Sequence, residues 1–266
     1  MKKFPYFLWI LFITTSLSHV CLEGRLYFLH IPKTGGTTLR FLLEQQLTKD
    51  EIYPDHFYKT AKSEVAHKLV DGHFPYWFCE QMDENFHSSF KVTILRDPVE
   101  RYLSFLRAKL RADDEIPDLE SLINLRKLAN YKYREGMIDN AICRYLSEDP
   151  LLQGEALLAS AKENLAKFDC VIFLDNFNQD VIQFFKRLDI DLESWEIPYL
   201  NTTTFTTPLN PKLLAEIKKI NELDIKLYEY AKTINLQKES RYALRTINPE
   251  NSHVFEIKVL HSQDSN

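Results

Sequence analysis

The segment that most restricts the possible fold is residues 25–47, where an apolar stretch, a glycine pair and a helical pattern follow one another. Residues 25–31, RLYFLHI, are apolar and rich in strand-favouring side chains, which predicts a buried first strand. The leucines of residues 39–47, LRFLLEQQL, recur near helical spacing. The chain has 6 glycines, so the pair Gly35-Gly36 indicates a tight turn between this strand and helix.

The same alternation continues along the chain. Further strands are predicted for LVDGHF, FKVTILRDP and DCVIFL, at residues 69–74, 90–98 and 169–174. PYWF after the first of these is interpreted as an aromatic loop, and 201–211 as a threonine-rich loop. Helices are predicted near 60–70, 99–110, 119–130, 135–147, 153–167, 176–188 and 211–235. The fold class is therefore α/β, a P-loop-like parallel sheet with helices on both faces.

Length favours one such domain, because the chain has 266 residues. We assign residues 25–236 to it and 237–266 to a C-terminal tail without a firm pattern. Residues 1–22 begin with Lys2-Lys3 and continue as an apolar run, which predicts a signal peptide or signal anchor. A buried first helix is the alternative. An uncleaved anchor would place residues 25–266 on the non-cytoplasmic side.

Charge and cysteine content narrow the class further. The net charge of −5 argues against a nucleic-acid binder. The cysteines beyond the N-terminal segment are Cys79, Cys143 and Cys170, without a CxxC pair. We therefore expect neither a zinc site nor a disulfide framework, although one disulfide remains possible.

The loop HIPKTGGTTL can hold a phosphate group. Gly35 and Gly36 let several N–H groups face one anion, and the helix that follows adds its positive end. Thr37 and Thr38 supply hydroxyls, Lys33 supplies a positive charge, and Thr34 lies between Lys33 and the glycines. Lys33 precedes the glycines, so the loop is not a Walker motif and has no evident magnesium ligand. A tight turn with an incidental lysine is the alternative.

A second segment, RDPVERYLS, follows the strand at residues 90–95. Asp97 and Pro98 are typical of a helix start. Arg96 at the strand end and Ser104 on the helix can hold a second phosphate. Taken alone, the segment is better explained by a capped helix start with a salt-bridged arginine.

Together the two segments resemble the nucleotide-binding motifs of sulfotransferases that use 3′-phosphoadenosine 5′-phosphosulfate. HIPKTGGTTL resembles the family's loop for the 5′-phosphosulfate, and RDPVERYLS its 3′-phosphate site. The resemblance is greatest to carbohydrate sulfotransferases of the Golgi, in particular the uronic acid 2-O group, and extends over about residues 26–235. It implies that residues Lys33 to Thr38, with Arg96 and Ser104, bind this co-substrate.

The 2-O group also has a Gly-His pair before an aromatic loop, and this histidine is its proposed base. Gly72-His73 before FPYWF matches it, which implies that His73 and Lys33 are catalytic. The alternative for His73 is a structural cap at a strand end. The family's basic residue near the threonine loop is absent from Leu200-Asn201-Thr202-Thr203. The ring of His30 is expected to pack beside the glycine loop.

This resemblance implies metal-free transfer of a sulfuryl group to a carbohydrate hydroxyl. Two alternatives remain: a P-loop kinase-like phosphotransferase, and an inactive nucleotide- or glycan-binding protein. Basic residues at 107–134 flank a candidate acceptor groove or simply form solvated helix faces. The expected location is the Golgi lumen or membrane in a eukaryote. In a bacterium, export would separate the enzyme from its cytosolic donor.

Overall fold

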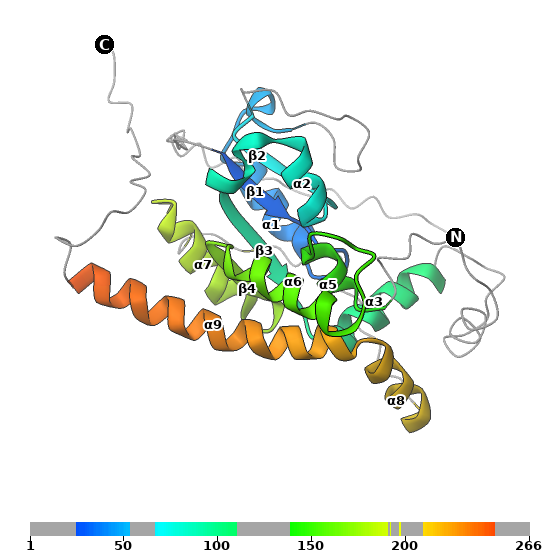
Figure 1. Ribbon diagram of the computed structural model, residues 1–266. Helices are drawn as coiled ribbons and strands as arrows, with labels where there is room; N and C mark the ends of the chain where they lie inside the picture. The colour runs from blue at the N-terminus through cyan, green and yellow to red at the C-terminus, as the bar shows by residue number, and fades with distance from the viewer. Residues whose placement is uncertain are drawn as a thin grey trace, which may run out of the picture.

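Four parallel strands form the centre of the protein (Figure 1). The computed structural model describes residues 25–53, 67–110, 139–190, 192, 197 and 210–247. Within them the strand order is β2-β1-β3-β4. The strands are β1 (Leu26–Leu29), β2 (Leu69–Gly72), β3 (Phe90–Leu95) and β4 (Cys170–Phe173). The register aligns Leu29 with both Gly72 and Thr93, and Leu95 with Phe173, so all four strands end near one edge.

Both faces of the sheet are apolar and covered by helices. Successive strand residues face opposite sides, so Tyr27 and Leu29 enter one core while Leu26 and Phe28 enter the other. The first core is completed by α2 (Tyr76–Met82), α5 (Ala141–Leu146), α6 (Gly154–Ala166) and α9 (Glu222–Ile247). The second is completed by α1 (Gly36–Glu44) and α7 (Phe177–Arg187). The predicted α/β class, a parallel sheet with helices on both faces, is confirmed.

The remaining described elements lie around this centre. Helix α3 (Pro98–Leu110) follows β3 and packs on α8 (Pro211–Ile220) through a small third core. Short 3-10 turns are η1 (Lys49–Glu51), η2 (Glu84–Ser88) and η4 (Leu174–Asn176). Helix α9 packs along α5 and α6 (Figure 1).

Two elements differ from the sequence prediction. The aromatic run PYWF is not a loop, because it begins α2 and buries Tyr76 against the core. The single helix predicted for 211–235 is two helices that meet at Asn221. At this junction the Asn221 carboxamide and the Asn221 N–H both donate to the Ile217 carbonyl, over 2.9 and 3.2 Å. Helix α9 then runs beyond residue 236 to Ile247.

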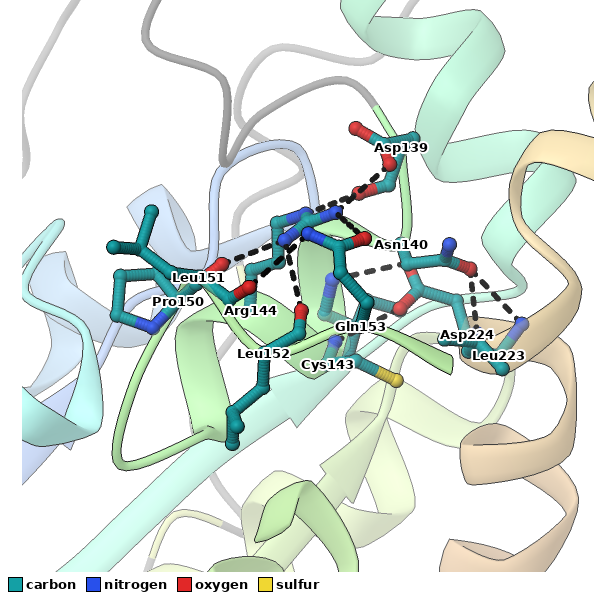
Figure 2. A network of polar contacts seen from close by, with 11 residues as sticks. Asp139, Asn140, Cys143, Arg144, Pro150, Leu151, Leu152, Gln153, Leu223 and Asp224 are labelled. Carbon is teal, nitrogen blue, oxygen red and sulfur yellow. Dashed lines mark hydrogen bonds and ion pairs between the residues drawn. The ribbon is translucent and has the colours of Figure 1, made fainter. Parts of the chain in front are cut away.

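A network of polar contacts joins α5 to α9 (Figure 2). The Asp224 carboxylate accepts from the N–H groups of Ile142 and Cys143, at 2.9 and 2.8 Å. In the opposite direction, the Asn140 side-chain oxygen accepts from the N–H groups of Leu223 and Asp224, at 2.9 and 3.3 Å. Each helix start thus receives its cap from the other helix.

Several predictions lie outside the described residues. They are the N-terminal segment 1–22, most of the helix at 60–70, the helix at 119–130, most of the basic residues at 107–134, the threonine loop and the tail beyond 247. Within the described residues no helix is long and apolar enough to cross a membrane.

Candidate functional site

The strand order places the candidate site between β1 and β3. The chain passes from β1 to β2 on one side, and then returns to pair β3 with the other side of β1. The segments that follow β1 and β3 therefore leave the sheet in different directions. A crevice at such a switch point, outside the carboxyl ends of the strands, is where open α/β sheets bind ligands. Both nucleotide-binding motifs predicted from the sequence begin at this point.

The glycine loop has a defined backbone shape. Lys33 and Gly35 have φ angles of 73° and 88°, both left-handed. The Thr34 hydroxyl donates to the Ile31 carbonyl over 2.8 Å, and the Thr38 N–H donates to the Gly35 carbonyl over 3.3 Å. Helix α1 begins at Gly36, so its first N–H groups and its positive end lie at the loop. Such a loop can hold an anionic oxygen.

Close packing explains why both glycines are needed. A Cβ atom on Gly35 would come within 2.6 Å of Leu174 Cδ1, and one on Gly36 within 2.3 Å of the His30 ring. Leu174 follows β4 and His30 follows β1, so the loop is held between two strand ends. The expected position of the His30 ring beside the loop is confirmed.

Arg96 connects the two motifs. Its Nη1 donates to the Lys33 carbonyl over 3.3 Å, and its Nη2 lies 3.6 Å from Glu100 Oε2. Burial lowers the pKa of the Arg96 guanidinium, while the Glu100 charge opposes this shift. An arginine remains charged at neutral pH nonetheless. Arg96 therefore adds positive charge directly beside the glycine loop.

Ser104 lies farther along α3. The helix begins at Pro98, with the Asp97 carboxylate accepting from the Glu100 N–H over 2.9 Å. A rise of about 1.5 Å per residue puts Ser104 roughly 9 Å along the axis from Pro98. Ser104 is half-buried, and within the described residues no hydrogen bond joins it to Arg96. A ligand would have to extend between the two side chains.

His73 lies at the end of β2, beside the same loop. Its Nδ1 is 2.8 Å from the His30 carbonyl oxygen, and the two histidine rings are 4.4 Å apart between centroids. His73 is half-buried, whereas His30 is 8% exposed and stacks on Phe28. The structure thus brings His73 to the loop that carries Lys33.

One pair at this edge was not predicted from the sequence. Asp175 follows β4 within η4, and its carboxylate accepts from the Tyr228 hydroxyl of α9 over 2.8 Å. Burial and this carboxylate raise the pKa of Tyr228. The charge of Asp175 also acts on Arg96. The position of Asp175 after a buried strand was a usable signal, but nothing local pointed to Tyr228.

The described residues include candidate metal ligands and three cysteine thiols. Among the described positions, no group of three or more His, Cys, Asp or Glu side chains could hold a metal ion. Cys79, Cys143 and Cys170 are buried free thiols. Burial raises the pKa of the Cys79 and Cys143 thiols, which opposes formation of the reactive thiolate.

The chain matches a known family over most of its length. The model described as "Sulfotransferase family" matches residues 19–231. Heparan-sulfate 6-O-sulfotransferase 2 of Gallus gallus is 24% identical over 277 residues, covering 81% of this chain and 68% of the relative. The enzyme of the same name from Homo sapiens is 27% identical over 281 residues, covering 81% of this chain and 45% of the relative. The chain thus spans less than half of the human protein's length.

A solved structure is similar at a lower level. Mouse sulfotransferase SULT7A1, determined with PAP, is 15% identical to this chain. The match has a TM-score of 0.33 and covers 77% of this chain and 66% of the other. The curated relatives are named for 6-O transfer, whereas the sequence motifs were closest to the uronic acid 2-O group. The comparisons therefore support the family as a whole and not the 2-O group in particular.

Proposed function

The chain belongs to the sulfotransferase family, and from that premise we propose that it moves a sulfuryl group from 3′-phosphoadenosine 5′-phosphosulfate to a carbohydrate hydroxyl. The observation that carries the proposal is the hydrogen bond from Arg96 to the Lys33 carbonyl. It unites the two motifs that resemble the 5′-phosphosulfate loop and the 3′-phosphate site. One nucleotide bearing both groups can span that junction.

The residues present fit such a donor. Its two anionic ends require two positively charged cradles, and the protein provides Lys33 with the start of α1, and Arg96 with α3. Ser104 lies farther along α3 and is the second residue proposed to bind the 3′-phosphate. The bound donor supplies the sulfuryl group. Side chains and N–H groups of this chain remove the acceptor proton and stabilise the charge on the leaving group.

In the proposed reaction, the acceptor oxygen forms a bond to sulfur as the bond from sulfur to the donor phosphate oxygen breaks. His73 takes the proton of the acceptor hydroxyl. Lys33, the N–H groups at the start of α1, and the hydroxyls of Thr37 and Thr38 stabilise the negative charge that develops on the leaving phosphate. Thr37 is exposed and Thr38 is buried, so Thr37 is the more accessible donor.

The acceptor is proposed as a carbohydrate because the curated relatives are named for heparan sulfate. Their names make the 6-O position of heparan sulfate the first acceptor to test. The Gly72-His73 match makes the 2-O position of a uronic acid the second. Arg107 on α3 is close enough to Arg96 to lower the pKa of its guanidinium, and it adds positive charge at this side of the site.

For location, we propose the secretory pathway, with the domain in the Golgi lumen or attached to its membrane if the source is eukaryotic. The support is the apolar N-terminal segment preceded by Lys2-Lys3. Fractionation of cells that express the tagged full chain, with protease protection of the tag, tests this location.

The function is tested by transfer of radiolabelled sulfate from the donor to a panel of glycans, with desulfated heparan sulfates included. His73→Ala should abolish transfer while it leaves binding of adenosine 3′,5′-bisphosphate nearly unchanged. His87→Ala is the matched control, because His87 is 60% exposed and lies in η2, before β3, at the other end of the sheet. Full transfer by His73→Ala would overturn the role of His73 as the base.

The same experiment separates the alternatives. Binding of the bisphosphate without transfer to any glycan would favour an inactive nucleotide- or glycan-binding protein. Magnesium-dependent phosphoryl transfer from ATP would favour the kinase-like alternative. Activity in the presence of EDTA is expected for the proposed sulfotransferase.

A further inference from the structure

His30 occupies a position between the glycine loop and the proposed base, and no role has so far been assigned to it. Its backbone carbonyl contacts His73 and its ring contacts Gly36. The inference that follows rests on the proposed function only in naming His73 as the base. The contacts themselves are independent of any substrate.

The contact with His73 determines which ring nitrogen carries the proton. A carbonyl oxygen can only accept, so the atom 2.8 Å away, His73 Nδ1, must donate. A neutral imidazole has one protonated nitrogen. With the proton on Nδ1, the lone pair lies on Nε2, which is the nitrogen a general base would use. Free histidine favours the opposite tautomer.

Two contacts hold His30 in place, and the lack of a side chain at Gly36 leaves room for its ring. The His30 N–H donates to the Gly72 carbonyl over 3.0 Å, which continues the pairing of β1 with β2. The His30 ring stacks on Phe28, with centroids 5.3 Å apart and planes at 10°. The ring also packs closely against Gly36, because a Cβ atom at position 36 would lie 2.3 Å from Cδ2 and Nε2 of His30. A side chain at position 36 would therefore force the ring, and with it the residue, to move.

We propose that His30 is a positioning residue, whose carbonyl sets the Nδ1-protonated tautomer of His73 and whose ring is seated by the absence of a side chain at Gly36. Gly36 then serves two parts of the site. It opens the start of α1 to an anion, and it keeps the proton-accepting lone pair of the base on Nε2. His30 thus contacts both the glycine loop and the proposed base.

The test is the tautomer of His73, measured by ¹⁵N NMR on the full chain with labelled histidine, without donor or acceptor. Protonated and bare ring nitrogens have well-separated shifts. The His73 signals are identified by their loss in His73→Gln. At a pH where the ring is neutral, the wild type should carry its proton on Nδ1. A wild type protonated on Nε2 would overturn the proposal.

Gly36→Ala tests the seat of the His30 ring. It should shift His73 toward a mixture of the two tautomers, because the carbonyl loses its position. Gly154→Ala is the control: Gly154 also has a positive φ, 54°, but a Cβ there would meet nothing within 4 Å. It should leave the wild-type tautomer unchanged. An unchanged tautomer in folded Gly36→Ala would show that Gly36 does not seat His30, and would overturn that part.

A purely structural role for His30 would not predict a tautomer change. His30→Ala retains the carbonyl and removes the ring, so it should also mix the tautomers. Failure of this inference about the His73 tautomer can be distinguished from failure of the proposed function. Absent sulfate transfer with an Nδ1-protonated His73 would refute the function alone. Normal transfer with an Nε2-protonated His73 would refute this inference alone.

Discussion

At the scale of single residues, Lys33 shows how one position serves a site in two ways. Its carbonyl accepts from Arg96, and its backbone adopts a left-handed φ of 73°. Its side chain supplies a positive charge at the loop. Because the backbone and the ammonium group have separate tasks, a substitution can remove the second while it preserves the first.

Lys33→Ala is such a substitution. Alanine and lysine both carry a Cβ atom, so the left-handed strain and the carbonyl contact are retained. Turnover should fall by roughly a hundredfold or more, as for loss of one charge-stabilising group. Binding of adenosine 3′,5′-bisphosphate should weaken less. Single-turnover kinetics measures the chemical step directly, and a normal rate there would exclude Lys33 from it.

Arg96→Ala should act on nucleotide affinity. We expect a loss of about 1.5–3 kcal/mol for the 3′,5′-bisphosphate, the usual range for a hydrogen bond to a charged group. A nucleotide that lacks the 3′-phosphate should lose less affinity, because the variant affects it only by removing the Arg96 contact with the Lys33 carbonyl. Titration calorimetry with both ligands separates the two. Equal losses would contradict a 3′-phosphate contact.

A matched arginine is available as the control for that variant. Arg187 Nη1 also contacts a backbone carbonyl, that of Asp169, at 3.4 Å. This contact lies at the start of β4, at the other end of the sheet. Arg187→Ala should therefore leave both nucleotide affinities unchanged.

At the scale of elements, α3, α5 and α9 depend on one buried carboxylate. Asp224 of α9 caps α5 through two N–H groups (Figure 2). Arg101 of α3 is fully buried. Burial lowers the pKa of the Arg101 guanidinium, and the Asp224 charge opposes this shift. The helix that begins beside Arg96 is thus anchored to the C-terminal helix.

Asp224→Ala should destabilise the protein by about 3–5 kcal/mol, because it removes the buried carboxylate that acts on Arg101 and accepts from two N–H groups of α5. Urea unfolding monitored by circular dichroism gives the change. Glu229→Ala on the same helix is the control, since its ion pair with Lys232 is exposed and should contribute about 0.2–1 kcal/mol. Similar losses for the two variants would show that Asp224 has no special structural role.

Asp83 stabilises the opposite end of the sheet in a pH-dependent way. Burial alone would raise the pKa of its carboxyl, but the Tyr27 hydroxyl, the Asn85 N–H and the Arg25 charge together lower it. A depressed folded pKa contributes stability that is complete above the unfolded value, about 3.9, and is lost as the pH falls through the folded value.

Asp83→Asn should therefore cost about 1.5–3 kcal/mol at neutral pH. The difference from wild type should narrow as the pH falls below about 4. Urea unfolding at a series of pH values measures this. Asp50→Asn, at an exposed position, reports the general effect of removing one negative charge. A gap that stays constant down to acid pH would contradict the role given to the Asp83 charge.

At the scale of the whole molecule, the proposed site joins both cores. The glycine loop leaves β1, whose side chains enter both cores, and it lies against Leu174 after β4. The glycine loop after β1 contacts Arg96 after β3 and Leu174 after β4, so a nucleotide bound at the loop would connect these strand ends. Ligand binding should for this reason stabilise the entire domain.

Adenosine 3′,5′-bisphosphate at a hundred times its Kd should add about 2.7 kcal/mol to the unfolding free energy. Thermal unfolding with EDTA present should show the same increase. His73→Ala should retain it, and Arg96→Ala should lose most of it at the same ligand concentration. A dependence on added divalent metal would contradict the metal-free binding proposed here.

Local signals predicted much of this structure. The strand, glycine loop and helix at 26–44 were readable because each feature depends on neighbours within one or two turns. The same holds for β3 and α3, with Asp97 and Pro98 at the helix start. PYWF was misread because its helix is stabilised by burial of Tyr76 and not by a local start signal.

The sequence by itself determined the α/β class and the positions of the two candidate anion-binding motifs, because strand periodicity, glycine placement and helix caps are local properties. Only the tertiary structure decided that Arg96 reaches the Lys33 carbonyl and that His73 donates to His30. It also decided that Asn140 caps the start of α9. These contacts join residues far apart in the chain. Their partners are chosen by how the strands order themselves and how the helices pack, which no short segment specifies.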